Sequence, residues 1–165
     1  MKKTFFITIL SLFVAAMAFA QNKTLPSVSI NTMEGQSINV ADLGSTGKIT
    51  VIIFWATWES HGKKELDNLK DYYSDWQGNY GLNIIAVNED NNRAAEQVPV
   101  RVQQKGWEYR ILHDYNNVFQ NAANISTVPY TLLIDANGSI VYEHANYEDG
   151  FEFVLEEQIK LLAKN

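Results

Sequence analysis

The chain has 165 residues, with 13 basic and 19 acidic side chains, a formal net charge of −6 and no cysteine. Its acidity argues against a nucleic-acid partner and against an anionic membrane surface, because both carry negative charge. The lack of cysteine excludes disulfide bonds and any thiol chemistry of this polypeptide's own.

The N-terminus has the layout of a secretory signal peptide. Two lysines precede an apolar run over residues 5–19, which ends in a small-residue pattern at Ala18 and Ala20. The run is short for a bilayer span, which needs about 20 predominantly apolar residues. We therefore expect residues 1–20 to be removed, leaving Gln21 first. An uncleaved anchor helix is the less favoured alternative.

The expected mature chain carries 11 basic and 19 acidic side chains, a net charge of −8, because the signal peptide holds two lysines and no acid. Gln21 stands where a lipid-anchored bacterial protein would need a cysteine, so we expect no membrane anchor after cleavage. Residues 21–165 have the length of one domain with its own core. We expect export to a bacterial periplasm, with secretion into the medium as the alternative.

The first elements after the signal peptide are predicted to be strands. Alternating apolar residues at Val28, Ile30, Ile38 and Val40 flank a glycine-containing turn and predict an opening β-hairpin. A nearly unbroken β-branched and aromatic run over residues 49–55 predicts a strand buried on both faces.

An amphipathic helix is predicted from His61 onward, with Lys63 four residues before Asp67 and with Gly78 and Gly81 closing it. Its apolar positions are Leu66, Leu69, Tyr72, Tyr73 and Trp76. This spacing predicts that most of the aromatic side chains belong to the core.

A second buried strand is predicted over residues 82–87. Asn91 or Asn92 can cap the next helix, which Pro99 should kink or restart, because proline lacks a helical donor. Gly106 is expected to end that helix.

The C-terminal half begins with a short extended piece at residues 111–112 and a short helix at 118–123. A strand over 131–135 then leads into Asn-Gly at 137–138, which can supply the positive φ angles of a tight turn to a partner strand at 140–142.

The last predicted helix places Val154, Leu155, Ile159 and Leu162 on one face. Two parallel strands joined by a crossover, followed by an antiparallel pair, predict an α/β fold with a mixed central sheet covered by helices on both faces.

Residues 54–66 read F-W-A-T-W-E-S-H-G-K-K-E-L. This segment resembles the active-site segment F-W-A-T-W-C-x-x-C-K-x-E-L of exported TlpA/ResA-type thiol-disulfide oxidoreductases, which belong to the thioredoxin-like superfamily. Glu59 stands at the first cysteine position and Gly62 at the second. Residues 126–131 resemble the family's cis-proline loop, and residues 133–138 resemble its closing hairpin.

The resemblance implies a thioredoxin-like fold with an N-terminal β-hairpin extension and with the C-x-x-C motif lost. In the family, the first thiolate attacks a substrate disulfide and the second cysteine resolves the intermediate. Neither Glu59 nor Gly62 can do this chemistry. We therefore assign no catalytic residue, cofactor or metal, and we expect a degenerate active site without thiol redox activity.

The leading functional hypothesis is an exported, non-catalytic protein that binds an extended peptide or an envelope protein. Its candidate binding site consists of Trp58, Glu59, Ser60, His61, Val128 and Pro129. The resemblance implies that Pro129 is cis, which would present the backbone of Val128 for pairing with an extended chain. The equally weighted alternative is that the cis turn only fixes the entry to the strand. Trp58 is expected to be exposed.

Two other functions are kept open. Glu59 and His61 could form a general acid/base pair or half of a metal site, although a carboxylate that simply stabilises a helix start is the favoured interpretation. The chain could also be a structural partner of cysteine-bearing relatives, and its oligomeric state is not assigned. His113 and His144 are isolated in sequence and are expected at the surface or at a sheet edge rather than as ligands.

Overall fold

The computed structural model describes residues 23–164, so the predicted signal peptide lies outside the described residues. In chain order the elements are β1 (Ser29–Thr32), β2 (Ser37–Asn39), the 3-10 helix η1 (Val40–Gly44), β3 (Thr50–Trp55), α1 (Ser60–Tyr80), β4 (Asn83–Asn88), α2 (Asn92–Ala95), α3 (Val98–Lys105), β5 (Arg110–His113), α4 (Val118–Ala122), β6 (Tyr130–Ile134), β7 (Ile140–Ala145) and α5 (Phe151–Ala163).

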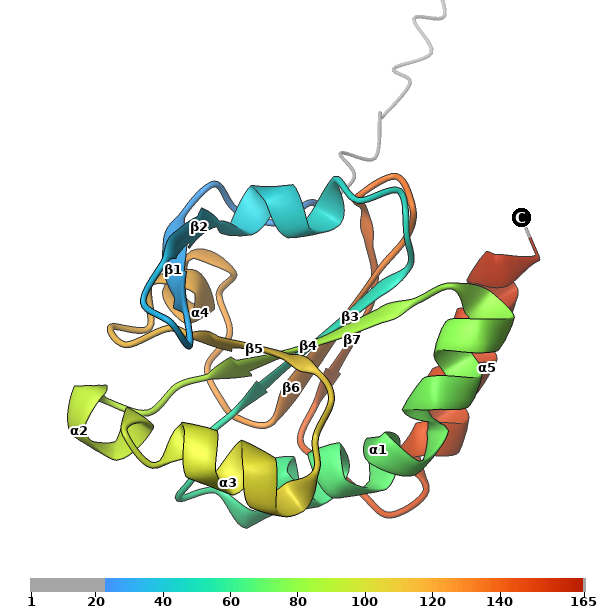
Figure 1. The fold of residues 1–165 in the computed structure, drawn as a ribbon. Coiled ribbons are helices and arrows are strands. Elements are labelled where there is room, and N and C mark those ends of the chain that lie inside the picture. The colour runs from blue at the N-terminus through green and yellow to red at the C-terminus, as the bar shows by residue number, and fades with distance from the viewer. Residues whose placement is uncertain (1–22, 165) are drawn as a thin grey trace, which may run out of the picture.

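The strands form one mixed, seven-stranded sheet in the order β2-β1-β5-β4-β3-β6-β7 (Figure 1). β3, β4 and β5 run parallel because α1 and the α2–α3 segment carry the chain back between them. β6 is antiparallel to β3, and β7 is antiparallel to β6. The opening hairpin of β1 and β2 joins the same sheet through β5. The predicted mixed sheet and hairpin extension are confirmed.

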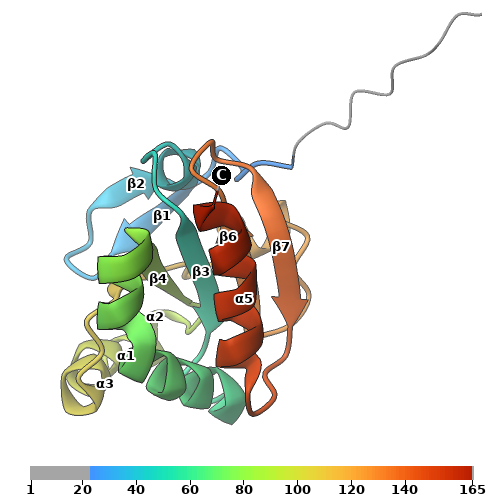
Figure 2. The ribbon, with the colours of Figure 1, turned by 90° about the vertical axis from the view of Figure 1, so that its right-hand side faces the viewer.

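Helices cover both faces of the sheet. α1, α3 and α5 pack on one face, where α1 and α5 lie side by side (Figure 2), while η1 and α4 pack on the other. All six residues of β3 are buried, as predicted for a strand covered on both sides. Its side chains alternate, with Ile53 and Trp55 in the first core and Ile52 and Phe54 in the second.

Helix α1 is the longest element and carries the start of the candidate site. Glu59 is its N-cap residue, and Gly81 ends it in the left-handed conformation at φ 64°. The predicted stop at Gly78 is wrong, because this glycine lies inside the helix, at a position where an added Cβ atom would meet nothing within 4 Å. Leu66 and Trp76 are buried, as the helical spacing predicted.

The α2–α3 segment follows the predicted pattern. The side chain of Asn91 accepts a hydrogen bond from the Ala94 N–H at 3.1 Å, which caps α2. Pro99 lies in the first turn of α3, where its missing donor costs nothing, and Gly106 ends this helix at φ 65°.

Three details differ from the predictions. Val40 begins η1 rather than ending a strand. In the β6–β7 turn only Gly138 has a positive φ angle, because the turn continues into a glycine bulge instead of closing over two residues. Val154 is exposed, and Phe151 takes its expected place on the buried face of α5.

Candidate functional site

The candidate site lies at one end of the sheet, where β3 and β4 finish and β6 begins. Trp55 at the end of β3 is paired with Asn88 at the end of β4, and Phe54 is paired with Tyr130 at the start of β6. The loop after β3 and the loop before β6 therefore meet at this edge. The two segments that the sequence analysis assigned to one site are brought together.

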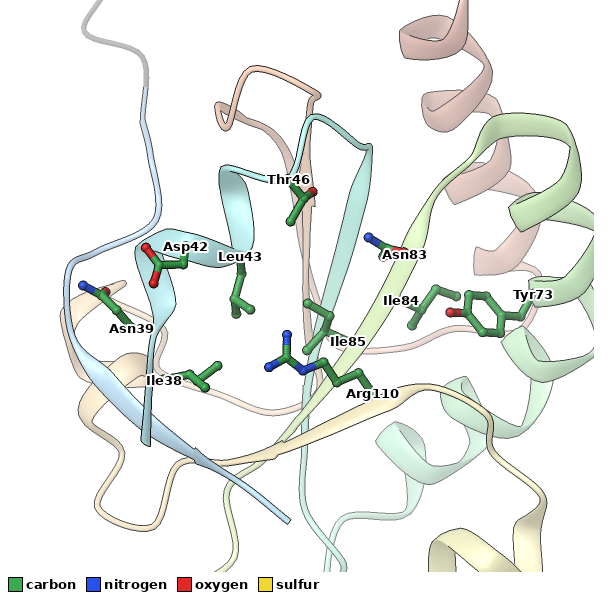
Figure 3. Close-up of a pocket in the computed structure, with 10 residues that line it drawn as sticks. All are labelled: Ile38, Asn39, Asp42, Leu43, Thr46, Tyr73, Asn83, Ile84, Ile85 and Arg110. Atoms are coloured by element: carbon green, nitrogen blue, oxygen red, sulfur yellow. The ribbon is translucent and has the colours of Figure 1, made fainter. Parts of the chain in front are cut away.

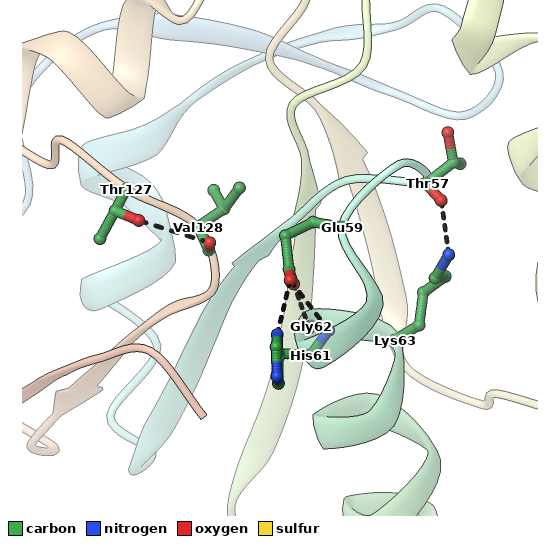
Figure 4. A network of polar contacts seen from close by, with 7 residues as sticks. All are labelled: Thr57, Glu59, His61, Gly62, Lys63, Thr127 and Val128. Carbon is green, nitrogen blue, oxygen red and sulfur yellow. Dashed lines mark hydrogen bonds and ion pairs between the residues drawn. The ribbon is translucent and has the colours of Figure 1, made fainter. Parts of the chain in front are cut away.

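The carboxylate of Glu59 caps the first turn of α1 (Figure 4). Its Oε1 accepts the His61 N–H at 3.0 Å, and its Oε2 accepts the Gly62 N–H at 2.5 Å. Oε1 also lies 3.0 Å from Nδ1 of His61. Partial burial tends to raise the pKa of Glu59, but the hydrogen bonds from Gly62 and His61 outweigh it and the pKa is lowered. The carboxylate is therefore held ionised by the helix start.

Gly62 is packed tightly beneath this carboxylate. A Cβ atom at residue 62 would lie 3.1 Å from Cβ of Trp55, 3.3 Å from Oε2 of Glu59 and 3.4 Å from Cβ of Pro129. The lack of a side chain at Gly62 thus makes room for the carboxylate of Glu59 and for the ring of Pro129. Glu59 and Gly62, which stand at the two cysteine positions of the family motif, are therefore packed against each other and joined by a hydrogen bond.

Trp58 projects from the loop between β3 and α1, in which both backbone polar groups of the preceding residue, Thr57, are hydrogen-bonded. The Asp90 carboxylate accepts the Thr57 N–H at 3.0 Å and the Thr57 hydroxyl at 3.0 Å. Nζ of Lys63 donates to the Thr57 carbonyl at 2.6 Å. Trp58 itself is 70% exposed, as predicted. A large aromatic side chain is therefore offered to solvent from a fixed backbone.

The contact of Lys63 with this loop replaces the helix-surface pairing suggested by its spacing from Asp67. Asp67 is instead paired with Nζ of Lys105 at 2.6 Å and accepts a hydrogen bond from Nε1 of Trp107 at 3.0 Å. Lys63 and Asp67 have the helical spacing that was predicted, but each interacts with groups outside α1 and not with the other.

The loop before β6 contributes backbone groups. The peptide bond between Val128 and Pro129 is cis. Pro129 is buried, so its ring supports the site from below rather than lining it, and Val128 is half-buried. The Val128 carbonyl accepts only a 3.4 Å hydrogen bond from the Thr127 hydroxyl, and within residues 23–164 the Val128 N–H has no hydrogen-bond partner. Figure 4 shows Val128 across from Glu59.

Glu65 is a buried acid below the candidate site that the sequence analysis did not single out. Its side chain is fully buried; Oε1 accepts the Thr131 hydroxyl at 2.5 Å, whereas Oε2 has no partner. Burial raises its pKa to about 8, and the negative charge of Glu59 acts in the same direction. Glu65 lies four residues before Leu69 and therefore on the apolar face of α1. An acidic residue at this spacing is the sequence signal from which its burial could have been predicted.

Glu89 is a second buried acid, at the end of β4. It is 7% exposed, and neither carboxyl oxygen has a hydrogen-bond partner. Burial raises its pKa to about 9, and the charges of Asp114 and Asp90 add to this. Between residues 23 and 164, no three His, Cys, Asp or Glu side chains are grouped so that they could hold a metal ion.

The other two histidines lie apart from each other. His113 is buried, contrary to expectation, because β5 is an interior strand of the sheet; its ring stacks on Tyr115 with centroids 5.1 Å apart, and burial lowers its pKa. His144 lies on the edge strand β7, as expected, and stacks on Phe151 at 4.2 Å. β4, β3 and β6 separate these two strands.

The geometry limits what Glu59 and His61 can do chemically. A general base works best with a pKa near the operating pH, whereas the pKa of Glu59 is lowered and both its oxygens already accept N–H groups. Within the described residues 23–164, the side chain of His61 has no hydrogen bond with a serine, threonine or lysine. The arrangement favours the interpretation of Glu59 as a helix cap.

Comparison with known proteins places this site in context. A sequence model of the AhpC/TSA family matches residues 21–143. The chain is 27% identical over 128 residues to the thiol-disulfide oxidoreductase ResA of Geobacillus thermodenitrificans, covering 78% of this chain and 71% of that protein. It is 26% identical over 128 residues to the sporulation thiol-disulfide oxidoreductase A of Bacillus subtilis, covering 76% and 75% of the two chains.

Solved structures similar to this chain include proteins with descriptions of the same kind. A thioredoxin-like protein of Porphyromonas gingivalis superposes with a TM-score of 0.76 at 36% identity, covering 87% of this chain and 95% of that one. A protein of Chlorobium tepidum described as a thiol:disulfide interchange protein DsbE superposes with a TM-score of 0.75 at 20% identity, covering 86% and 96%. The predicted thioredoxin-like fold is confirmed, and the chain belongs to the AhpC/TSA family of thioredoxin-like proteins.

Proposed function

We propose that this protein is an exported, thiol-free member of its family that binds an extended segment of a peptide or an envelope protein at the candidate site. The observation that carries the proposal is the unpartnered Val128 N–H on the loop that packs against the start of α1. A free backbone donor at a sheet end can pair with an extended chain without any sulfur.

The exposed indole of Trp58 supplies the second part of the proposed recognition. Aromatic side chains that are large and held in place contribute strongly to binding surfaces, because they bury much area with little loss of conformational entropy. The hydrogen bonds that Asp90 and Lys63 make to Thr57 fix the backbone that carries this side chain. We expect an extended chain to contact Trp58 and to pair with Val128.

The proposed location follows from the N-terminal sequence. We propose that residues 1–20 are a signal peptide, that residues 21–165 fold as one domain, and that the protein acts in the periplasm, with secretion as the alternative. Within residues 23–164 the structure contains no helix long and apolar enough to cross a membrane.

The proposal is tested by capture from an envelope fraction with the immobilised protein. We expect Trp58→Ala to abolish capture of a defined set of peptides or proteins. Val141→Ala is the matched control, because Val141 is an exposed apolar residue at 45% exposure on β7, beside the end of β6, whereas the candidate site lies where β6 begins. Equal capture by the wild type and the Trp58→Ala variant would contradict the proposal.

The contact between Glu59 and His61 supports a second candidate, a non-thiol enzyme that uses this pair. Their 3.0 Å separation is a suitable geometry for proton transfer. Metal content and hydrolase activity of the pure protein distinguish the candidates. An activity that Glu59→Gln removes would favour the enzyme, whereas a preparation that is inert with and without the substitution would favour the binding protein.

A further inference from the structure

A cavity of about 400 Å³ lies at the opposite end of β4 from the candidate site. Its walls come from η1 and β2 on one side and from the beginnings of β4 and β5 on the other (Figure 3). This volume is in the range of small-molecule sites. The apolar walls are formed by Ile38, Leu43, Ile84 and Ile85.

The cavity follows from the way the sheet opens. β5 pairs with β4 only from Ile85 onward, where Ile85 is opposite Arg110. β1 pairs with β5 only at the C-terminal end of β5, where Asn31 and Thr32 of β1 are opposite His113 and Leu112. The strands therefore diverge toward the start of β4, and η1 covers the resulting wedge. The space is set by the strand register rather than by a single mobile side chain.

Arg110 is an exposed residue that contributes a positive charge to the lining of this wedge. Its guanidinium group is turned toward Ile38 and Leu43, whereas the carboxylate of Asp42 is turned away from it (Figure 3). Arg110 forms no ion pair or side-chain hydrogen bond with any of the residues 23–164. The charge of Arg110 acts on Glu34, whose pKa is lowered first by a hydrogen bond with Thr32 and to a smaller extent by Arg110.

We propose that this cavity binds a small monocarboxylate with an apolar tail. The planar guanidinium of Arg110 matches the two oxygens of a carboxylate, and the isoleucine and leucine walls suit a hydrocarbon chain. The single positive charge of Arg110 balances the single negative charge of a carboxylate. A phosphate would bring up to two charges toward a wedge that has Asp42 at its rim, in a protein with a net charge of −6. Arg110 is exposed, so we expect an affinity on the order of 1 mM for such a small ligand.

The first test is a titration of the isotope-labelled protein with 4-methylpentanoate, followed by NMR. Saturable shifts of the amides of Ile84, Ile85 and Arg110 are expected. The uncharged 4-methylpentanamide should bind about tenfold more weakly, because it loses the charge-assisted hydrogen bonds. Equal affinity for the amide, tighter binding of inorganic phosphate, or shifts confined to other regions would overturn the proposal.

Four variants assign the effect to the cavity. Arg110→Gln should weaken 4-methylpentanoate binding about tenfold and Arg110→Lys less, because lysine keeps the charge but loses the planar fork. Arg93→Gln, on the exposed surface of α2, is the matched control and should change nothing. Glu34→Gln should tighten binding slightly by removing a competing carboxylate. The spectrum of each variant without ligand reports whether it is folded, and unchanged affinity in a folded Arg110→Gln variant would overturn the proposal.

Discussion

Two carboxyl groups in the first turns of α1 have opposite environments. Glu59 is at the helix start, where two backbone N–H groups point at its oxygens and its pKa is lowered. Glu65 is six residues further on, fully buried, with one hydroxyl partner and one unpartnered oxygen, and its pKa is raised to about 8. The same side chain is thus held ionised at one position and protonated at the other.

The difference shows what decides the charge state of an acid in this fold. Donors that already exist at a helix start can stabilise a carboxylate at the surface, because the N–H groups there have no partner inside the helix. Below the surface the helix offers no free donors, so the desolvation of the charged form dominates. The charge of Glu59 also disfavours ionisation of Glu65.

The largest expected effect of the difference between Glu59 and Glu65 is that the free energy of unfolding depends on pH through Glu65. The carboxyl of Glu65 titrates near 4.5 when exposed and near 8 in the folded protein. Between these values the folded state binds more protons than the unfolded state, so this group's contribution to the free energy of unfolding falls as pH rises. The expected slope is about 1.4 kcal/mol per pH unit.

Urea unfolding of Glu65→Gln and of the wild type at several pH values between 5 and 8 measures this slope. The variant should lack the contribution of Glu65, while the effects of Glu89 and His113 stay the same in both proteins. Glu96→Gln, at an exposed position on the α2–α3 segment, is the control and should follow the wild type. Parallel curves for Glu65→Gln and the wild type would show that Glu65 is ionised.

The next effect concerns the packing that allows Glu59 to cap the helix. Gly62→Val should lower the free energy of unfolding by about 1 to 3 kcal/mol, because the added atoms meet Trp55 and Pro129, which are both buried. Gly78→Val in the same helix is the matched control, since no atom lies within 4 Å of a Cβ there. Thermal or urea unfolding measures both, and equal losses at the two glycines would contradict the packing described for Gly62.

A smaller effect is expected from the cap itself. Glu59→Ala should destabilise the protein by about 1 kcal/mol, because two N–H groups lose their acceptor. Glu59→Asp should recover most of this, since aspartate is a favoured N-cap residue. Ser60→Ala is the control, because the hydroxyl of Ser60 has no hydrogen-bond partner among residues 23–164. Full stability of Glu59→Ala would mean that the carboxylate does not act as a cap.

The smallest effect is a partial return of redox chemistry. Introducing Glu59→Cys together with Gly62→Cys should restore a bridge between the two thiols and weak disulfide reductase activity, because residue 59 is the N-cap of α1 and residue 62 lies in its first turn. The close contact of residue 62 with Trp55 limits how well the bridge fits. Mass spectrometry of the folded variant shows whether the bridge forms, and two persistent free thiols would refute the assignment of these positions.

Much of the fold was predictable because local patterns and tertiary structure agree. Three features lie where the sequence indicated. These are the β-branched and aromatic run of β3, the helical spacing of Leu66 and Trp76, and the glycine at 106. The meeting of the Glu59 loop with the Val128 loop was also predicted, but only from the family resemblance, since no local pattern reports contacts between distant segments.

The buried acids and the cavity were not predictable from patterns in one sequence. Whether Glu65 is protonated depends on the donors that surround it, and these come from β6 as well as from its own helix. His113 was expected at the surface or at a sheet edge, because the place of β5 between β1 and β4 depends on strand order. The wedge at Arg110 depends on strand register, which hydrophobic alternation does not specify for short strands.

Pairing of an extended chain with Val128 can be tested by hydrogen exchange at the Val128 amide, measured by NMR in the free protein and in complex with a peptide obtained by capture. We expect the peptide to form a hydrogen bond with this N–H and to slow its exchange about tenfold or more. An exchange rate at Val128 that is the same in the free and the bound protein would contradict binding of an extended chain at this site.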